Sequence, residues 1–387
     1  MIVHLFNSSS VSGPERLVLP ALASSGNHFV IINLLEDRIE RLRASDPLEL
    51  YARSLNLPYD AIHVRGRADF QAVHELQQLL LQLNPSLVHA HGIKASIYLL
   101  QAQRKSKSNY LIVSTHHGAR GLPDWKVKLY EFFYRRFFLR FFDRVLCVSS
   151  ADHELLLHSG ISSRHLRLHF NGVDGHLIAP EQRTDEAQHI RRLWFPKERH
   201  YQTFFLGVVA RLSPEKDHFR LLRILSRLNQ LPCDRDWRCL IFGMGELEMQ
   251  LRQSAQELGL SKRVVWMGYR ENVGNELVGL DLLLSFSKAE GLPINLIEAG
   301  WAGTPVMSTS VGGVVDLIPN ENYGQGVLPK EPVAISALRL QMCMSAKGRM
   351  KLDEQARSFQ GRVTQEFTQK KWLHRLDAIY SDLGVAP

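Results

Sequence analysis

The first half of the chain alternates short apolar runs with longer amphipathic segments. This succession is typical of βα units around a parallel sheet. The clearest helix has apolar residues three and four positions apart between Val73 and Leu83, and Asn84-Pro85 predicts its end. We predict six strands in this half, at Ile2–Phe6, His28–Leu34, Ala61–Val64, Leu87–Ala90, Leu111–Ser114 and Arg144–Val148.

The second half restarts the same alternation. It predicts five further strands, near Phe204–Val209, Arg238–Phe242, Val264–Met267, Leu282–Ser285 and Pro305–Thr309. The whole pattern predicts an α/β protein with two Rossmann-like, doubly wound domains. Ligands bind beyond the carboxyl ends of the strands in such sheets, so we expect the two domains to face each other across a deep cleft.

Domain boundaries follow from where the strand signal stops. We predict a first domain at residues 1–180, a connection at 181–203 and a second domain at 204–365. The stretch from Leu352 to Leu383 predicts one or two polar-faced helices. We expect residues 366–387 to form a C-terminal helix that packs back on the first domain.

Composition narrows the class of protein. The 387 residues carry a formal net charge of +8, which favours anionic partners such as nucleotides, nucleic acid or acidic lipid headgroups. Apolar runs fall short of the roughly 20 residues of a spanning helix, and the first residues lack a signal-peptide pattern. Four cysteines without CxxC spacing argue against a disulfide framework. We expect a cytoplasmic protein that can rest on the inner face of a membrane.

The most informative segment runs from Ser285 to Ala299. A buried strand ends in a loop, and Pro293 suits the first turn of a helix. The amide groups at this helix N-terminus form an anion site suited to a diphosphate. They include those of Gly291, Leu292, Ile294 and Asn295. Glu290 in the loop and Glu298 in the helix are expected to accept hydrogen bonds from sugar and ribose hydroxyls. A solvated loop acid and a surface helix residue are the alternatives.

A second segment carries two cations after a predicted strand. Arg211 follows the strand end, and Lys216 comes five positions later at a helix start. Together they can neutralise a departing diphosphate, because a guanidinium supplies a bidentate fork and an ammonium a compact charge. The alternative is a solvated pair that caps the next helix.

Two glycine-containing loops are weaker signals. Gly13, after the first strand, allows close approach of a ligand, and Gly243 lies in a partial glycine loop after a later strand. The P-loop and the Rossmann GxGxxG patterns are both missing from the sequence, which weakens an NTPase or a dehydrogenase interpretation.

Four histidines lie at or just after the ends of predicted strands: His89, His91, His116 and His117. Their spacing matches neither HExxH nor a Cys/His zinc pattern, so we expect no metal site. One histidine that bonds a sugar hydroxyl is the favoured role.

Residues 124–144 combine aromatic and basic side chains on a helical pattern. A helix that lies in the interface of an anionic membrane has this composition. The alternative is an ordinary helix with its phenylalanines in the core. Single-stranded nucleic acid is disfavoured as a partner, because no RRM, KH or helix-turn-helix signature accompanies the segment.

Taken in this order, the segments resemble the retaining glycosyltransferases of family 4, which have the GT-B fold. Glu290 and Glu298 match the EX7E motif of that family, and Ala302–Val306 and Thr309–Gly313 match the stretches after it. The resemblance implies that Arg211 and Lys216 bind phosphates. It further implies that the stretch with Arg270 holds the nucleobase. It also implies that His117 is the histidine of the cleft, with His116 as the alternative. This sequence departs from the family's pattern in the loops that contain Gly13 and Gly243.

The resemblance implies transfer of a sugar, with retention, from a nucleotide-diphosphate sugar to an acceptor hydroxyl. The first domain would then take the acceptor and the second the donor, with no metal and no other cofactor. Polysaccharide, lipopolysaccharide or glycolipid synthesis is the expected setting, with a sugar or a lipid-linked acceptor. A GT-B epimerase or phosphorylase and a non-catalytic sugar- or nucleic-acid-binding protein remain as alternatives.

Overall fold

The computed structural model describes residues 1–36, 46–66, 69–104, 109–118, 125–175, 177–179, 181–196 and 203–385, with the backbone alone at 125–128. It divides into two compact units. The first unit contains the described residues up to Gly172 and those from Gln369 onward. The second contains those from Val173 to Thr368.

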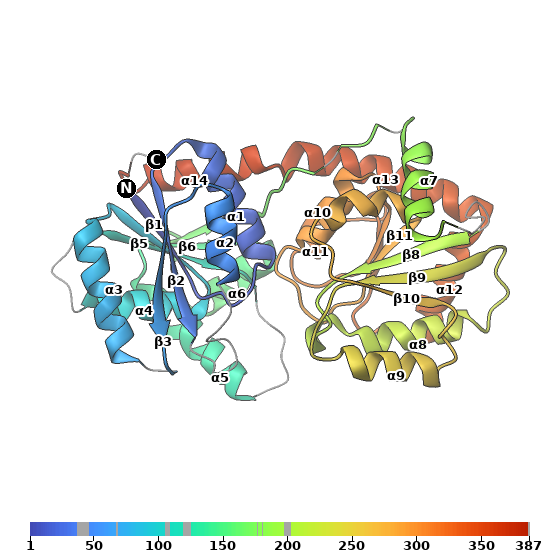
Figure 1. Cartoon of the computed structure of the whole chain (residues 1–387), viewed down its shortest axis with the longest axis horizontal. Coiled ribbons are helices and arrows are strands. Elements are labelled where there is room, and N and C mark those ends of the chain that lie inside the picture. Colours follow the sequence, from blue (N-terminus) through green and yellow to red (C-terminus); the bar gives the residue numbers. More distant parts are fainter. Residues whose placement is uncertain are drawn as a thin grey trace. The chain divides into compact units, whose positions relative to one another are not determined.

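The first unit is built on a sheet of seven parallel strands in the order β3-β2-β1-β4-β5-β6-β7 (Figure 1). The strands are β1 (Ile2–Phe6), β2 (Phe29–Glu36), β3 (Tyr59–Val64), β4 (Leu87–His91), β5 (Leu111–His116), β6 (Arg144–Cys147) and β7 (Leu166–Leu168). Every residue of β1 and β4 is buried, as expected for central parallel strands. The strand order reverses between β1 and β4, so the connecting helices cover both faces of the sheet.

Seven α-helices of this unit lie in the described part of the chain. They are α1 (Gly13–Ser25), α2 (Pro47–Ser54), α3 (Phe70–Leu83), α4 (Ile93–Arg104), α5 (Trp125–Phe133), α6 (Ser150–His158) and α14 (Gln369–Ser381). Local chemistry sets the ends of α3: the Asp69 carboxylate accepts from the first-turn amides of Gln71 and Ala72, and Asn84 adopts a left-handed conformation after the last turn. Its buried face includes Val73 and Leu76, which confirms the predicted helix.

The second unit contains six parallel strands in the order β10-β9-β8-β11-β12-β13 (Figure 1). The strands are β8 (Thr203–Val209), β9 (Asp236–Phe242), β10 (Val264–Gly268), β11 (Leu282–Ser285), β12 (Val306–Thr309) and β13 (Gln325–Val327). The α-helices are α7 (Arg183–Trp194), α8 (His218–Leu228), α9 (Glu248–Glu257), α10 (Ile294–Trp301), α11 (Val314–Leu317), α12 (Val333–Met344) and α13 (Ala346–Glu366). Here the strand order reverses between β8 and β11.

All eleven predicted strands are present, and the two doubly wound domains are confirmed. The prediction missed β7 and β13, edge strands of three residues each, because such short segments carry no clear periodicity. The C-terminal stretch forms two helices, α13 in the second unit and α14 in the first. Among the described residues, no helix is both long and apolar enough to cross a membrane.

The stretch predicted as a connection between domains contains a helix. α7 occupies most of residues 181–196, and its Ala187 and Ile190 pack against Val278 in an apolar cluster of the second unit. The compact units meet in sequence between Gly172 and Val173, rather than at residue 180. Composition suggested a linker because α7 is strongly polar, but its apolar positions recur with helical spacing and are buried.

Candidate active site

Two adjacent strands of the second unit deliver the predicted site residues to one edge of the sheet. β8 and β11 pair in parallel, with Leu282 opposite Leu206, so the loops after both strands leave the sheet side by side. The Asn295 side-chain amide in the first turn of α10 donates to the carbonyl oxygen of Val209 over 2.8 Å. This edge lies at the reversal of strand order, where doubly wound sheets bind their ligands.

An ion pair joins the two loops. The Lys216 Nζ lies 2.7 Å from Oε1 and 2.9 Å from Oε2 of Glu290, and the hydroxyl of Ser287 donates to Oε1 over 2.6 Å. The exposed fractions of the two charged side chains are 21% for Lys216 and 9% for Glu290. Three charge-assisted hydrogen bonds therefore orient the Glu290 carboxylate, while the ammonium group stays accessible from solvent.

Arg211 is held far more loosely than Lys216. Its side chain is 69% exposed, and its Nη2 lies 3.6 Å from Oε1 of Glu215. That same carboxylate oxygen accepts from the hydroxyl of Ser213 over 2.6 Å. A long, exposed guanidinium in the Lys216 loop offers a bidentate fork to an anionic ligand.

Glycines permit the close packing of these loops. Gly312 has a positive φ of 51°, and a β-carbon there would lie 1.8 Å from the carbonyl oxygen of Glu290. Its neighbour Gly313 donates its amide to the Gly291 carbonyl over 2.6 Å. At Gly243, with φ at 139°, a β-carbon would lie 2.0 Å from the carbonyl oxygen of Ala210. Both positions exclude other residues because backbone atoms occupy the space.

The start of α10 provides backbone rather than side chains to the site. Leu292 and Pro293 are buried, whereas Gly291 and Ile294 are half-buried. Pro293 precedes the helix with an extended backbone conformation, at φ −73° and ψ 118°. Amide groups at such a helix start favour a bound anion. Glu298, in the second turn, is half-buried.

Arg270 lies farther along the same edge, after β10. Its Nε is 3.3 Å from Oε1 of Glu276, and the indole of Trp194 donates to Oε2 of that carboxylate over 2.6 Å. In the sheet, β9 separates β10 from β8. The structure thus pairs Lys216 with Glu290 and places Arg211 in the same loop as Lys216, whereas Arg270 lies farther along the edge, after β10.

Gly13 and His117 belong to the first unit, each beyond the carboxyl end of a strand. Gly13 begins α1, and the carboxylate of Glu15 accepts from both the amide and the hydroxyl of Ser12 in a capping box. His117 follows β5 and is half-buried, and burial lowers its pKa to about 4. Within the described part of the chain, its Nε2 has no hydrogen-bond partner. A neutral imidazole of this kind can donate or accept one hydrogen bond.

The fallback residue, His116, is less suited to contact a ligand. Its side chain is 3% exposed, and its Nε2 lies 3.8 Å from Oδ1 of Asp152. Burial lowers its pKa to about 3.

His89 and His91, which the sequence singled out, lie with the unpredicted His4 in a buried cluster of the first unit. The ring nitrogens of His4, His89 and His91 lie within 4.8 Å of one another. His4 Nδ1 and His91 Nε2 are 2.9 Å apart, and the two nitrogens of His89 bond the hydroxyls of Tyr380 and Thr115, each over 2.7 Å. These contacts use both nitrogens of His89, whereas His4 Nε2 and His91 Nδ1 are buried and have no hydrogen-bond partner among the described residues. Burial holds the pKa of all three imidazoles well below the usual range, so the cluster is neutral.

Several residues that hold the site residues in place were also not predicted from the sequence. Ser287 holds the Glu290 carboxylate, and the hydroxyl of Thr309 donates to the Ser287 carbonyl over 2.6 Å. His4 gave no signal because it lies within the apolar run of β1. Short polar residues at strand ends of an α/β sheet are the pattern that could have found Ser287 and Thr309.

Two family models match the chain, one on each unit. The model described as "Glycosyltransferase Family 4" matches residues 16–177, and "Glycosyl transferases group 1" matches residues 190–359. A UDP-Gal:alpha-D-GlcNAc-diphosphoundecaprenol alpha-1,3-galactosyltransferase of Escherichia coli is 25% identical over 331 residues, which cover 84% of this chain and 82% of that protein. A lipopolysaccharide 1,6-galactosyltransferase of Salmonella typhimurium is 25% identical over 255 residues, 64% of this chain and 62% of that protein.

The fold is shared with solved structures. The crystal structure of Anabaena Alr3699/HepE in complex with UDP and glucose superposes with a TM-score of 0.81 and 18% identity, over 98% of this chain and 99% of that one. The epimerase, phosphorylase and non-catalytic alternatives gain no support from these matches. Since the two family models together span most of the chain, it is a glycosyltransferase of family 4 with the GT-B fold.

Proposed function

We propose that this glycosyltransferase moves a sugar from a uridine diphosphate sugar to a sugar or lipid-linked acceptor, with retention at the anomeric carbon. The observation that carries the proposal is the Lys216–Glu290 ion pair at the reversal of strand order in the second sheet. The Escherichia coli relative is named for UDP-Gal and the Anabaena structure is a complex with UDP, and both support the choice of donor.

The chemistry we propose separates charge at the anomeric carbon. The bond from that carbon to the diphosphate oxygen breaks, and the acceptor oxygen bonds to it on the same face. The departing phosphate takes the acceptor proton. Lys216, Arg211 and the amides at the start of α10 stabilise the growing negative charge. Glu290 orients the donor sugar, Glu298 accepts from the ribose hydroxyls, and His117 bonds a sugar hydroxyl.

The Lys216–Glu290 pair has a second consequence for donor binding. A diphosphate beside Lys216 would share its ammonium group with the carboxylate, which Ser287 continues to hold. The carboxylate then becomes an acceptor for a donor hydroxyl without moving far. This preorganisation keeps the reorganisation energy low.

We test this function with radiolabelled UDP-galactose and UDP-glucose and a lipid-linked N-acetylglucosaminyl diphosphate acceptor. The expected products are UDP and a glycosylated lipid whose new anomeric configuration, read by NMR, matches that of the donor. Lys216→Ala should lower turnover by a factor of about 10²–10³. The matched control is Lys262→Ala, at an exposed position before β10. An isomerised nucleotide sugar, or a donor that is bound but never consumed, would contradict the proposal.

We also propose that transfer needs no metal ion, because Lys216 and Arg211 supply the positive charge. Initial rates should be unchanged within about twofold after treatment with EDTA. Loss of activity that added magnesium restores would overturn this part of the proposal.

A membrane-facing role is proposed for an aromatic surface on the first unit. This surface follows α5 through a π-helical turn, Tyr134–Phe138, and a 3₁₀ turn, Leu139–Phe141. Its exposed members are Leu129, Tyr130, Phe132, Phe133, Phe137 and Phe141. The Arg104 guanidinium lies 4.6 Å from the Phe141 ring centroid. Residue 124 and the side chains of 125–128, which the sequence analysis included in this segment, lie outside the description.

An anionic bilayer fits this aromatic surface, because exposed rings insert at the headgroup level while arginines meet anionic lipid. The enzyme would then work at the inner face of a membrane, where nucleotide sugars are available. Phe137→Ser/Phe141→Ser should lower co-sedimentation with phosphatidylglycerol vesicles at low salt. The matched control is Phe70→Ser, since Phe70 is 70% exposed on α3. Equal sedimentation of all three proteins would exclude this surface as the contact.

A further inference from the structure

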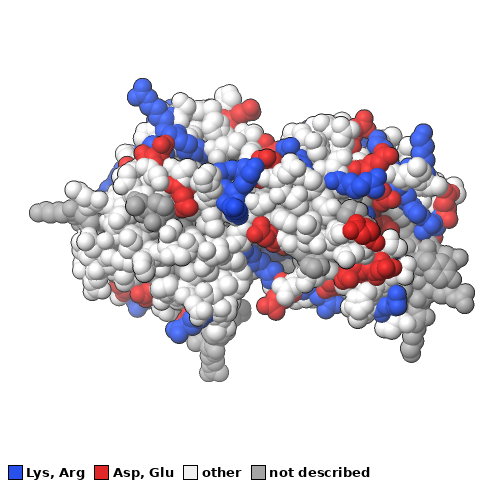
Figure 2. Space-filling model, turned by 90° about the horizontal axis from the view of Figure 1, so that it is seen from above, with Lys and Arg blue, Asp and Glu red and all other residues white. Residues whose placement is uncertain are grey.

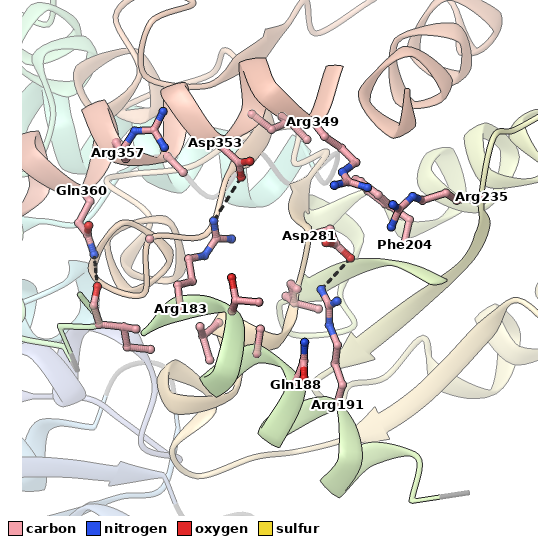
Figure 3. A pocket seen from close by; sticks show the side chains of 18 of the residues that line it. Arg183, Gln188, Arg191, Phe204, Arg235, Asp281, Arg349, Asp353, Arg357 and Gln360 are labelled. Carbon is pink, nitrogen blue, oxygen red and sulfur yellow. Dashed lines mark hydrogen bonds and ion pairs between the residues drawn. The ribbon is translucent and has the colours of Figure 1, made fainter. Parts of the chain in front are cut away.

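A pocket of about 700 Å³ lies in the second unit, between α7 and α13. Its floor reaches Phe204 at the start of β8 and Asp281 just before β11 (Figure 3). The pocket therefore opens at the amino-terminal edge of the sheet, opposite the edge that carries Lys216 and Glu290. A volume of this size is typical of small-molecule sites.

Arginines dominate the polar lining of this arginine pocket. Six arginines and two aspartates line it, an excess of four positive charges. The arginines are Arg183, Arg191, Arg192, Arg235, Arg349 and Arg357. Figure 2, which views the chain from the side of α13, shows basic and acidic side chains side by side on the second unit. Guanidinium groups that converge on one cavity attract anions, since each offers a fork that fits a phosphate.

Two of the arginines are fixed by structural contacts. Arg191 Nη2 lies 2.8 Å from Oδ2 of Asp281, and its Nε donates to the Gly279 carbonyl over 2.8 Å. Arg183 Nη1 lies 3.6 Å from Oδ1 of Asp353 and so bridges α7 to α13 (Figure 3). These pairs neutralise both aspartates of the pocket.

The remaining charge is available to a ligand. Among the residues that the structure describes, the side chains of Arg192, Arg349 and Arg357 form neither a hydrogen bond nor an ion pair. In Figure 3, Arg349 and Arg357 project from α13 on either side of Asp353. They therefore remain solvated cations beside the cavity.

A buried donor without a partner also points to a ligand. The Nε of Arg183 is buried and has no hydrogen-bond partner in the described part of the chain. Burial lowers the pKa of this guanidinium, with Asp353 acting in the opposite direction. An unsatisfied buried N–H is costly, and an anionic oxygen in the cavity would satisfy it.

The lining is not polar throughout. Phe204, Leu280 and Leu352 contribute an apolar floor. A ligand with an apolar or planar body and several anionic groups would match both parts of the lining.

We propose that the arginine pocket binds a soluble small molecule that carries at least two phosphate groups. This site is separate from the proposed donor site. Gln360 lines the pocket, and its side-chain amide donates to the carbonyl of Trp301 over 3.0 Å, at the last turn of α10. The arginine pocket thus lies at the C-terminal end of the helix whose first turn belongs to the candidate active site.

The test uses inorganic tripolyphosphate as the probe and the full chain as the protein. Isothermal titration calorimetry gives the affinity, and hydrogen exchange read by mass spectrometry locates the contact. Binding should slow exchange in α7 and α13. R349Q/R357Q should weaken this binding by about tenfold or more for each guanidinium removed, because charge-assisted hydrogen bonds are lost. The matched control is R223Q/R227Q, which removes the same charge from the exposed side of α8.

Several results would overturn the proposal. Tripolyphosphate that slows exchange only in the Lys216 and Glu290 loops binds at the donor site and leaves the arginine pocket without a ligand. Equal weakening in R349Q/R357Q and in R223Q/R227Q would show attraction to net charge alone. Melting temperatures of both double variants, compared with the parent, separate lost binding from lost folding. If R349Q/R357Q melts much earlier, single R349Q and R357Q variants replace it in the same titration.

Discussion

Acidification should destabilise the first unit, because its sheet buries several neutral imidazoles. Burial lowers the pKa of His4 to about 3 and that of His169 to about 4, and holds those of His89 and His91 well below the usual range. The groups that face His4 are the imidazoles of His89 and His91 and the ring of Phe29. They offer no negative charge that would stabilise a proton on His4.

The loss of unfolding free energy on acidification follows from the lowered pKa of His4. An unfolded histidine has a pKa near 6.5, so above that pH both states are neutral and the imidazole does not affect stability. Below pH 6.5, His4 binds a proton in the unfolded chain. In the native state His4 stays neutral until the pH falls to about 3. Each pH unit in this window lowers the free energy of unfolding by about 1.4 kcal/mol. Between pH 7.5 and 5.5, His4 should thus account for a loss of about 1.4 kcal/mol.

The perturbation is His4→Gln, which keeps a polar side chain but removes the titration. Between pH 7.5 and 5.5, the variant should lose about 1.4 kcal/mol less than the parent, whatever its absolute stability. The assay is urea unfolding followed by pulse-labelled hydrogen exchange, read on the β1 and β4 peptides so that the first unit is observed alone. The matched control is His28→Gln, at an exposed position before β2. If the parent and His4→Gln lose the same free energy, the native state does not hold His4 neutral and the reasoning fails.

Three further predictions concern the second unit. Glu290→Gln should lower turnover about 10²-fold with little change in melting temperature, since it removes a charge that orients the donor; unchanged initial rates would count against that role. Gly312→Ala should lower the melting temperature more than Gly26→Ala, because both have positive φ but only Gly312 meets a backbone atom; equal shifts by calorimetry would contradict the packing described. Asn295→Ala should lower the free energy of unfolding in urea by about 0.5–1.5 kcal/mol, because the half-buried Val209 carbonyl loses its side-chain donor; a change near zero would show that water replaces it.

Local patterns in the sequence predicted most of the strands and the two-domain fold. Periodicity of apolar residues predicted all the longer strands and the helix α3, since a helix or strand repeats its buried face over a few residues. The spacing of Glu290 and Glu298 placed one acid in a loop and the other on a helix, as the structure has them. The helix α7 was not predicted because its few apolar residues are buried only by packing against Val278, which lies far along the chain.

The contacts that define the candidate sites depend on strand order, which local periodicity does not encode. Lys216 meets Glu290 because β8 pairs with β11, and His4 meets His91 because β1 pairs with β4. Likewise, the arginine pocket forms only where α7 and α13 pack together, although more than 150 residues separate Arg183 from Arg349. Residue types and short spacings follow from each segment alone, whereas these pairings arise because burying all the segments at once leaves few ways to order them in a sheet.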